Sequence, residues 1–285
     1  MKSVFQDFSV QRAYEEYGFV ILPFFSNEGL DRLAQFFREE TIQEARAFYT
    51  STDLNEPSFR LSGDQRIRNE VRRAGIEFIV DGYSELFGSF IVKQPAEMGD
   101  STVDLHSDWS IQDETRHYAL TLWFPLQDVD VQNGCMHVVP GSHRKIQRIR
   151  GVGIPEPYRK YRSLFQFKDL VALPMKKGQV LCYHNALLHA SPPNSSSEQR
   201  LACLVACHPK SVQPVLYYQR YWRLRTPVQQ YAVNRNFFAA YDKRSRPAAL
   251  TLAGSQTYVV PRLSRFDFLN FRNPLLSDRN ACYFT

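Results

Sequence analysis

The feature that most constrains this chain is a series of short apolar runs between residues 89 and 209. Gly, Pro, Asn and Ser separate the runs, which read in order SFIVKQPAE, STVDLHSDW, HYALTLWFPL, CMHVVPGSH, DLVALPM, QVLCYHNALLHAS and RLACLVACHP. Short strands at roughly regular spacing with turn residues between them are typical of a β-sandwich or barrel. The sequence therefore predicts a mostly β fold.

Flanking helices are predicted on the N-terminal side of these runs. Residues 9–18 predict a short helix ending at Gly18, and the following GFVILPFF predicts a buried strand. Ser26 is a candidate N-cap for a second helix, whose apolar positions recur at helical spacing. Residues 51–75 are polar and predict a loop, and IEFIVDGYSELFG predicts another helix.

One domain over residues 1–285 is the simplest organisation. A chain of 285 residues is long enough for a well-buried core, and we find no internal repeat and no convincing linker. From about residue 215 the chain is rich in aromatic residues and arginine with weak periodicity. This part predicts an irregular C-terminal extension with one or two helices.

Nothing in the sequence predicts a membrane or secretory protein. No run of eighteen apolar residues is present, and the first residues lack an apolar segment followed by a small-residue cleavage site. The five cysteines lack CxxC spacing and are expected to be reduced and mostly buried. A cytoplasmic protein with no membrane partner is the default expectation.

The net charge of +6 comes mainly from arginine, in clusters such as residues 144–150 and 220–225. A solvated basic face is one explanation, and an anionic substrate is the other, because arginine offers two parallel donors to a carboxylate or phosphate. No nucleic-acid-binding motif accompanies the charge, so a nucleic-acid partner is not expected.

The stretch DLHSDWS places His106 and Asp108 two residues apart in a strand-like run. In a strand, residues i and i+2 face the same side, so both side chains would point into one space. They would supply two members of the two-His, one-carboxylate set that holds non-haem Fe(II) with its opposite face open. A surface pair, or a histidine hydrogen-bonded to a nearby aspartate, is the alternative that this motif alone leaves open.

A third ligand would be a histidine on a later strand, and the chain has seven histidines in all. His189 stands out because it follows a β-like run after Gly178. Ser191 lies two residues beyond it, and Arg200 eleven residues beyond it. A dicarboxylate in a partly dry pocket needs a planar double donor of the kind that arginine provides.

Taken together, these motifs resemble the phytanoyl-CoA dioxygenase family of Fe(II)- and 2-oxoglutarate-dependent oxygenases. The resemblance rests on H-x-D, then W-x-x-L-x-D-x-x-x-x-N-G-C-x-x-x-x-P-G-S-H, then G-Q-V-L…H-A-S-P-x-N…R, in that order. It covers about residues 10–210, and the last 75 residues match nothing that we can name. It implies a double-stranded β-helix (a jelly-roll, cupin-like core) with flanking helices.

The resemblance also implies a set of catalytic and cofactor-binding residues. His106, Asp108 and His189 would be the iron ligands, and iron, 2-oxoglutarate and dioxygen the cofactors. Arg200 would pair with the distal carboxylate of 2-oxoglutarate, and Ser191 would donate a hydrogen bond to the same group.

Five further side chains are candidates for the cofactor pocket or the substrate site. Trp123 occupies the family's tryptophan position, and Thr121 shares its strand face, so both are expected to line the cofactor pocket, with plain core packing as the alternative. Gln94 and Lys93 precede the metal-binding strand and are expected to reach the C1 end of 2-oxoglutarate or the substrate. Trp109 is expected to shape the mouth of the site.

A lid over the substrate is predicted in residues 144–168, which are long, basic and aromatic. Arg144 and Tyr158 in this segment suit an anionic substrate with an apolar body, such as a natural-product intermediate or an acyl thioester. Residues 211–285 would complete the pocket or form a dimer contact, so a monomer and a homodimer both remain open.

The reaction expected from the resemblance is hydroxylation of an unactivated C–H bond, with release of succinate and carbon dioxide. Desaturation, epoxidation and cyclisation remain open because no motif separates them. A non-catalytic jelly-roll binding protein is the main alternative, and a cupin-like hydrolase or isomerase with another metal is a second. An intact triad together with Arg200 and Ser191 argues against both.

Overall fold

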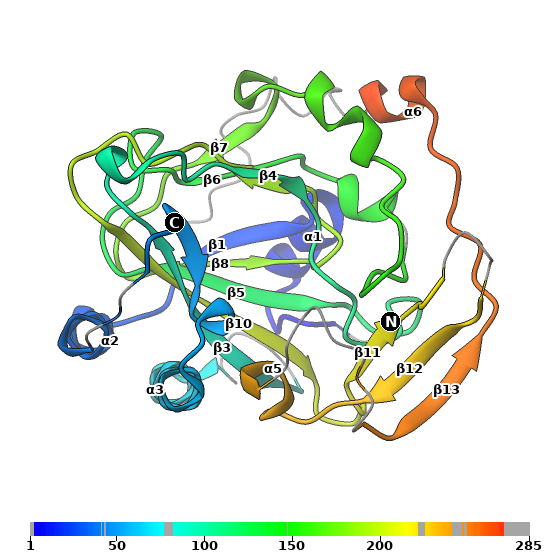
Figure 1. Cartoon of the computed structure of the whole chain (residues 1–285), viewed down its shortest axis with the longest axis horizontal. Helices are drawn as coiled ribbons and strands as arrows, with labels where there is room; N and C mark the ends of the chain where they lie inside the picture. Colours follow the sequence, from blue (N-terminus) through cyan, green and yellow to red (C-terminus); the bar gives the residue numbers. More distant parts are fainter. Residues whose placement is uncertain are drawn as a thin grey trace.

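The computed structural model describes residues 3–40, 42, 44–76, 82–146, 148–221, 226–240, 247 and 250–270. Two antiparallel sheets form its core (Figure 1). The major sheet has the strand order β1-β8-β5-β10-β3-β2, with bounds Phe19–Pro23, Gln179–Tyr183, Leu120–Pro125, Arg200–Pro209, Tyr83–Lys93 and Phe48–Thr50. The minor sheet has the order β4-β9-β6-β7, with bounds Val103–His106, His189–Ser191, Met136–Val138 and Val171–Leu173.

The two sheets pack face to face through alternating side chains. On the major sheet Trp123, Tyr183 and Ala202 face inward, where they join one buried apolar cluster with Val138 and Leu173 of the minor sheet. Inward and outward alternation along strands of two facing sheets is the arrangement of a β-sandwich. The predicted mostly β, jelly-roll architecture is therefore confirmed.

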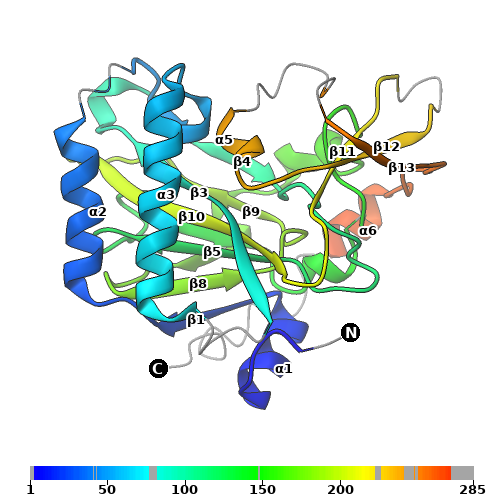
Figure 2. The same cartoon turned by 90° about the horizontal axis from the view of Figure 1, so that it is seen from below.

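Two helices cover the outer face of the major sheet, α2 (Asn27–Glu39) and α3 (Pro57–Ala74) (Figure 2). The two helices and the sheet share one apolar cluster. In its centre the ring of Phe90 on β3 lies 6.1 Å from Phe36 of α2 and 6.1 Å from Phe59 of α3, measured between ring centroids. These helices therefore fix the outer side of the strands whose inner side faces the other sheet.

The predicted N-terminal elements are present. Helix α1 (Phe8–Tyr17) begins at the N-cap Asp7 and ends at Gly18, whose φ of 85° is the left-handed conformation that glycine adopts without strain. Helix α2 begins after Ser26, whose hydroxyl accepts a hydrogen bond from the Gly29 amide, as expected of an N-cap.

Two local predictions were wrong. The polar segment predicted as a loop contains α3, because Phe59, Gly63, Ile67 and Val71 recur every four residues and form a narrow buried stripe among charged residues. The segment IEFIVDGYSELFG was predicted to be a helix, but from Tyr83 onward it is strand β3. Residues 77–81 of that segment lie outside the described residues.

The C-terminal part is more regular than predicted. Its described residues form a third sheet of β11 (Val215–Tyr218), β12 (Val228–Ala232) and β13 (Leu252–Gln256), together with the short helices α5 (Phe237–Ala240) and α6 (Arg265–Leu269). The strands are short, and β13 is largely exposed, so their sequences lack the apolar alternation that predicts a strand.

Short 3-10 helices connect several of these elements: η1 (Ser51–Asp53), η2 (Ala96–Met98), η3 (Ser142–Arg144), η4 (Arg159–Leu164) and η5 (Phe167–Asp169). In the part of the chain that the structure describes, no helix is long and apolar enough to cross a membrane.

Replacing Phe90 with alanine tests the contact between the helices and the major sheet. Phe90 is fully buried and packs on three other phenylalanines, so Phe90→Ala is expected to lower the free energy of unfolding by about 3–5 kcal/mol in urea titrations. Phe8→Ala is the control, since Phe8 is 80% exposed, and is expected to change it by less than about 0.5 kcal/mol. Equal stabilities for the two variants would contradict this packing.

Candidate metal and co-substrate site

Three side chains of the minor sheet and its adjoining loop converge on one point. His106 of β4 lies directly opposite His189 of β9 in the strand register, and their ring centroids are 4.2 Å apart. The Nε2 atoms of both lie 3.9 Å from Oδ1 of Asp108. One ligand atom from each residue fits within 4.8 Å of the others, and no other group of three His, Cys, Asp or Glu in the described ranges does so.

Both histidines present Nε2 to this point because Nδ1 is engaged elsewhere. Nδ1 of His106 lies 2.8 Å from the Asp104 carbonyl, and Nδ1 of His189 lies 2.9 Å from the Leu187 carbonyl, so each Nδ1–H donates to the backbone. Desolvation, and then the neighbouring His189, lower the pKa of His106 to about 4. His106 is therefore neutral at pH 7, with its Nε2 lone pair available to a metal.

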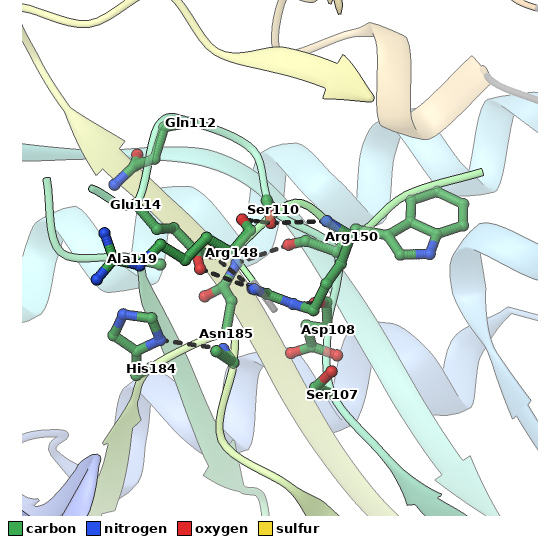
Figure 3. Close-up of polar contacts among 12 residues, drawn as sticks. Ser107, Asp108, Ser110, Gln112, Glu114, Ala119, Arg148, Arg150, His184 and Asn185 are labelled. Carbon is green, nitrogen blue, oxygen red and sulfur yellow. Dashed lines mark hydrogen bonds and ion pairs between the residues drawn. The ribbon is translucent and has the colours of Figure 1, made fainter. Parts of the chain in front are cut away.

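Asp108 is held by contacts that the sequence did not predict. Strand β4 ends at His106, so the alternation of a strand does not orient Asp108, which lies in the loop that follows. Its amide donates to the Asn185 carbonyl at 2.8 Å, and its own carbonyl accepts from Nε of Arg150 at 2.7 Å (Figure 3). The Tyr183 hydroxyl donates to its Oδ2 at 2.7 Å.

Tyr183 links two members of the triad. Its ring lies 5.2 Å from the His189 ring in an edge-to-face arrangement, and its hydroxyl binds the Asp108 carboxylate. Burial and then the Asp108 charge raise the pKa of Tyr183 well above its usual value, so the hydroxyl stays protonated and donates. The alternation of β8 could have identified Tyr183, because it lies two residues beyond Leu181 and both side chains face inward.

Arg200 begins β10 and lies directly opposite Lys93 of β3. Its guanidinium is buried 5.6 Å from the Trp123 ring, and burial lowers its pKa to about 10. Among the described residues, its Nε and Nη1 have no hydrogen-bond partner. A buried charge with unpaired donors is costly, so this side chain fits an anionic acceptor.

Ser191 and Thr121 lie near the triad on opposite sheets. Ser191 follows His189 by two residues on β9, so both side chains share one strand face, and Ser191 is buried. Thr121 of β5 donates from its hydroxyl to Oδ1 of Asn185 at 3.0 Å. Thr121 thus supports the segment that holds the Asp108 amide.

A cavity of about 300 Å³ opens onto His106 and Asp108. Thr121 and Trp109 also form part of its wall. The apolar wall comes from β3, β10, α5 and the loop after Asp108: Phe87, Ile91, Leu204, Ala206, Phe238 and Ile111. The cavity is the size of a small organic ligand.

Three residues predicted to contact cofactor or substrate lie away from this cavity. Nζ of Lys93 donates to the Ser101 carbonyl at 2.6 Å and also to backbone carbonyls at the end of β9; desolvation, and then Arg200, lower its pKa to about 6. Oε1 of Gln94 accepts from the side-chain Nε2 of Gln199 at 3.0 Å. Arg144 is exposed at the turn η3.

The segment predicted as a lid is packed against the body of the protein. Tyr158 is fully buried, accepts a hydrogen bond from the Ser107 amide at 3.0 Å and stacks on Phe268 of α6. It therefore supports the loop between the two metal-ligand candidates and does not line the cavity. Glu156 is the member of this segment that does line the cavity.

Comparisons with known proteins agree with this geometry. A family described as phytanoyl-CoA dioxygenase (PhyH) matches residues 14–202. Phytanoyl-CoA dioxygenase domain-containing protein 1 homolog of Dictyostelium discoideum is 27% identical over 191 residues, which are 60% of this chain and 66% of that protein. Phytanoyl-CoA dioxygenase of Arabidopsis thaliana is 33% identical over 119 residues, which are 40% of each chain. The chain thus spans less than two thirds of either relative.

Solved structures share the fold. EvdMO1 superposes with a TM-score of 0.50 and 20% identity over 71% of this chain and 50% of that chain. The epimerase SnoN, solved in complex with Fe3+, alpha ketoglutarate and nogalamycin RO, gives a TM-score of 0.50 and 21% identity over 72% of this chain and 86% of that chain. At this identity the likeness shows a common fold.

The Tyr183 hydroxyl can be tested separately from the triad. Tyr183→Phe removes the donor to Asp108 and leaves the ring in place, so the affinity for a divalent metal is expected to fall about 10–100-fold. Anaerobic titration with Co(II), followed by its visible absorption, measures this. Tyr14→Phe is the control, because that equally buried hydroxyl binds the Ala119 carbonyl; equal affinities in both variants would contradict the role of Tyr183.

Proposed function

Because this chain belongs to the phytanoyl-CoA dioxygenase family, we propose that it is a non-haem Fe(II)- and 2-oxoglutarate-dependent dioxygenase. The observation that carries the proposal is the combination of two features. One is a His-Asp-His group with its ligand atoms within 4.8 Å, and the other is a buried arginine with two unpaired donors at the inner face of the opposite sheet. SnoN, which shares the fold, was solved with iron and the same co-substrate.

His106, Asp108 and His189 are the proposed iron ligands. Two imidazoles and one carboxylate are the ligand set that would hold Fe(II). When bound, iron and 2-oxoglutarate supply the oxidising chemistry, in which dioxygen is consumed and succinate and carbon dioxide are released. The chain contributes ligand orientation through the Nδ1 bonds of the histidines and through Tyr183.

Arg200 is the proposed anchor of the distal carboxylate of 2-oxoglutarate. Its Nε and Nη1 have no partner among the described residues and offer charged donors to a carboxylate, and the guanidinium carbon lies over the Trp123 ring, 5.6 Å from its centroid. Ser191 is proposed to add a hydroxyl donor to the same carboxylate, and Thr121 and Trp123 to border the pocket. Lys93 and Gln94, with their polar atoms engaged elsewhere, are not part of this proposal.

The proposed substrate is a small organic molecule, or the end of a medium-sized one, that is neutral or carries an amine. The cavity of about 300 Å³ has an apolar wall and also presents Thr50, Ser89, Asn185 and Glu156. No lysine or arginine lines it within the described part of the chain. The predicted anionic substrate therefore has no support from Arg144, and hydroxyl or amino groups match the wall better.

The proposed reaction is hydroxylation of an unactivated C–H bond of that substrate. The wall residues orient the substrate and exclude water from the open side of the triad. Because Trp109 and Phe238 line this cavity, they are the residues proposed to shape the access of the substrate.

Removing any one ligand tests the iron assignment. His106→Ala, Asp108→Ala and His189→Ala are each expected to reduce succinate formation, measured in air with added Fe(II), 2-oxoglutarate and a candidate substrate, to the level of a blank without enzyme. The far-ultraviolet circular dichroism of the His106→Ala and Asp108→Ala proteins is expected to remain that of the wild type, because these two side chains border a cavity. Full activity in the Asp108→Ala protein would refute the assignment.

Replacing Arg200 tests the co-substrate anchor. Arg200→Met removes the donors and keeps a buried chain of similar length, so the apparent affinity for 2-oxoglutarate is expected to fall about tenfold or more, as expected for loss of charge-assisted hydrogen bonds. The affinity for the metal alone is expected to be unchanged. Lys177→Met is the control, since Lys177 binds Asp31 on the surface; an Arg200→Met protein with the affinity of this control would show that the anchor lies elsewhere.

A further inference from the structure

The position of Asp108 requires an explanation beyond the strand pairing of the two histidines. His106 and His189 are fixed by the β4–β9 register, but Asp108 lies past the end of β4 in a loop. A metal-ligand set must be held within a fraction of an ångström, and ligands on loops are held less precisely than ligands on strands. Other contacts must therefore fix this loop.

A buried ion pair lies directly behind Asp108. Arg150 and Glu114 form a two-pronged pair, with Nη1 to Oε2 at 2.8 Å and Nη2 to Oε1 at 2.6 Å, and their side chains are only 3% and 2% exposed. The remaining side of the same guanidinium, Nε, donates to the Asp108 carbonyl at 2.7 Å (Figure 3). Because the guanidinium is rigid and planar, Glu114 sets the direction in which Nε points.

Backbone bonds tie the same two segments together. The amide of Ser110 donates to the Arg150 carbonyl at 3.1 Å, and the amide of Arg150 donates to the Ser110 hydroxyl at 3.1 Å. That hydroxyl also donates to the Arg148 carbonyl at 2.7 Å. The loop that carries Asp108 is therefore fastened to residues 148–150 by the backbone and by the ion pair.

Residues 150–153 are in turn held by the C-terminal sheet. The amide of Val152 donates to the Tyr217 carbonyl at 3.0 Å, and the amide of Gln219 donates to the Val152 carbonyl at 2.9 Å. A Cβ at Gly153, which has a φ of 75°, would lie 2.1 Å from the Gln219 carbonyl oxygen, so glycine is required for this approach. A chain of contacts thus runs from β11 through Arg150 to Asp108.

We propose that the buried Arg150–Glu114 pair is a positioning device for Asp108, and that the C-terminal sheet supports it. This inference rests on the proposed function, since it assigns the pair to the metal-ligand set. Each partner needs the other: a lone buried arginine or glutamate would be an uncompensated charge in the protein interior. Burial raises the pKa of Glu114, and the contacts with Arg150 and Ser110 lower it again. The ion pair therefore offsets part of the free-energy cost of burying this carboxylate.

A second buried ion pair gives a matched control. Arg68 and Asp64 in α3 form a similar two-pronged pair, with side chains 7% and 3% exposed. This pair packs between α3 and β3, where Asp64 also accepts from the Gly88 amide at 2.7 Å. Shortening Arg68 therefore perturbs a buried pair of the same chemistry that contacts neither Asp108 nor the loop after it.

The test compares Arg150→Lys with Arg68→Lys, using Co(II) as the probe in anaerobic titrations of the full chain. A lysine keeps the charge but cannot bind Glu114 with two prongs and the Asp108 carbonyl at once. Arg150→Lys is expected to weaken Co(II) binding about 10–100-fold and to change the visible spectrum of the bound ion. Arg68→Lys is expected to leave both within about twofold of the wild type, although both variants lower the thermal midpoint of unfolding.

Glu114→Gln keeps the size of the side chain and serves if Arg150→Lys does not fold. It is expected to weaken Co(II) binding in the same direction, because Arg150 is then free to turn away from Asp108. Folded variants at residues 114 and 150 that bind Co(II) like the Arg68→Lys protein, with the wild-type spectrum, would overturn the inference and leave the pair a stabilising contact. Wild-type protein that binds no divalent metal would instead overturn the proposed function first.

Discussion

The direct cross-strand pairing of His106 with His189 is the contact on which the site depends. The two imidazoles lie on neighbouring strands, and Nδ1 of each donates to a backbone carbonyl two residues earlier in the chain. The two Nε2 atoms are therefore both turned to one point. The β4–β9 register sets the distance between them, and the packing of the minor sheet on the major sheet sets what they face. The carboxylate of Asp108 comes from a loop, and contacts from other parts of the chain hold it in position.

The major sheet has two roles because its two faces differ. Its outer face buries aromatic side chains under α2 and α3, which keeps the strands in place. Its inner face carries Tyr183 toward the triad and a buried Arg200 with unpaired donors. The minor sheet thus carries two of the proposed metal ligands and the major sheet the proposed anchor for an acid, with a small cavity beside His106 and Asp108.

Patterns along the chain predicted His106, Asp108, His189 and Arg200 as site residues. The structure brings the first three together, although Asp108 lies in a loop. Arg150 and Glu114 were not predicted, because they are 36 residues apart in loops and no local pattern links them. Arg150 belongs to a basic cluster that composition favours as a solvated face, whereas in the structure it is buried. Lys93 differs in the opposite sense. Its position in the sequence suggested a contact with cofactor or substrate, whereas in the structure its amine donates to backbone carbonyls. The α3 stripe was missed because its apolar positions are single residues among charged ones, and the C-terminal sheet because its strands are short and β13 is largely exposed.

The most direct test of the account is spectroscopic. Fe(II) and then 2-oxoglutarate are added without oxygen to metal-free protein, and the weak visible charge-transfer band of the chelate is sought. The account predicts that the band appears in the wild-type protein and is absent from the Asp108→Ala protein. Wild-type protein that binds Fe(II) but gives no band on addition of 2-oxoglutarate would contradict it.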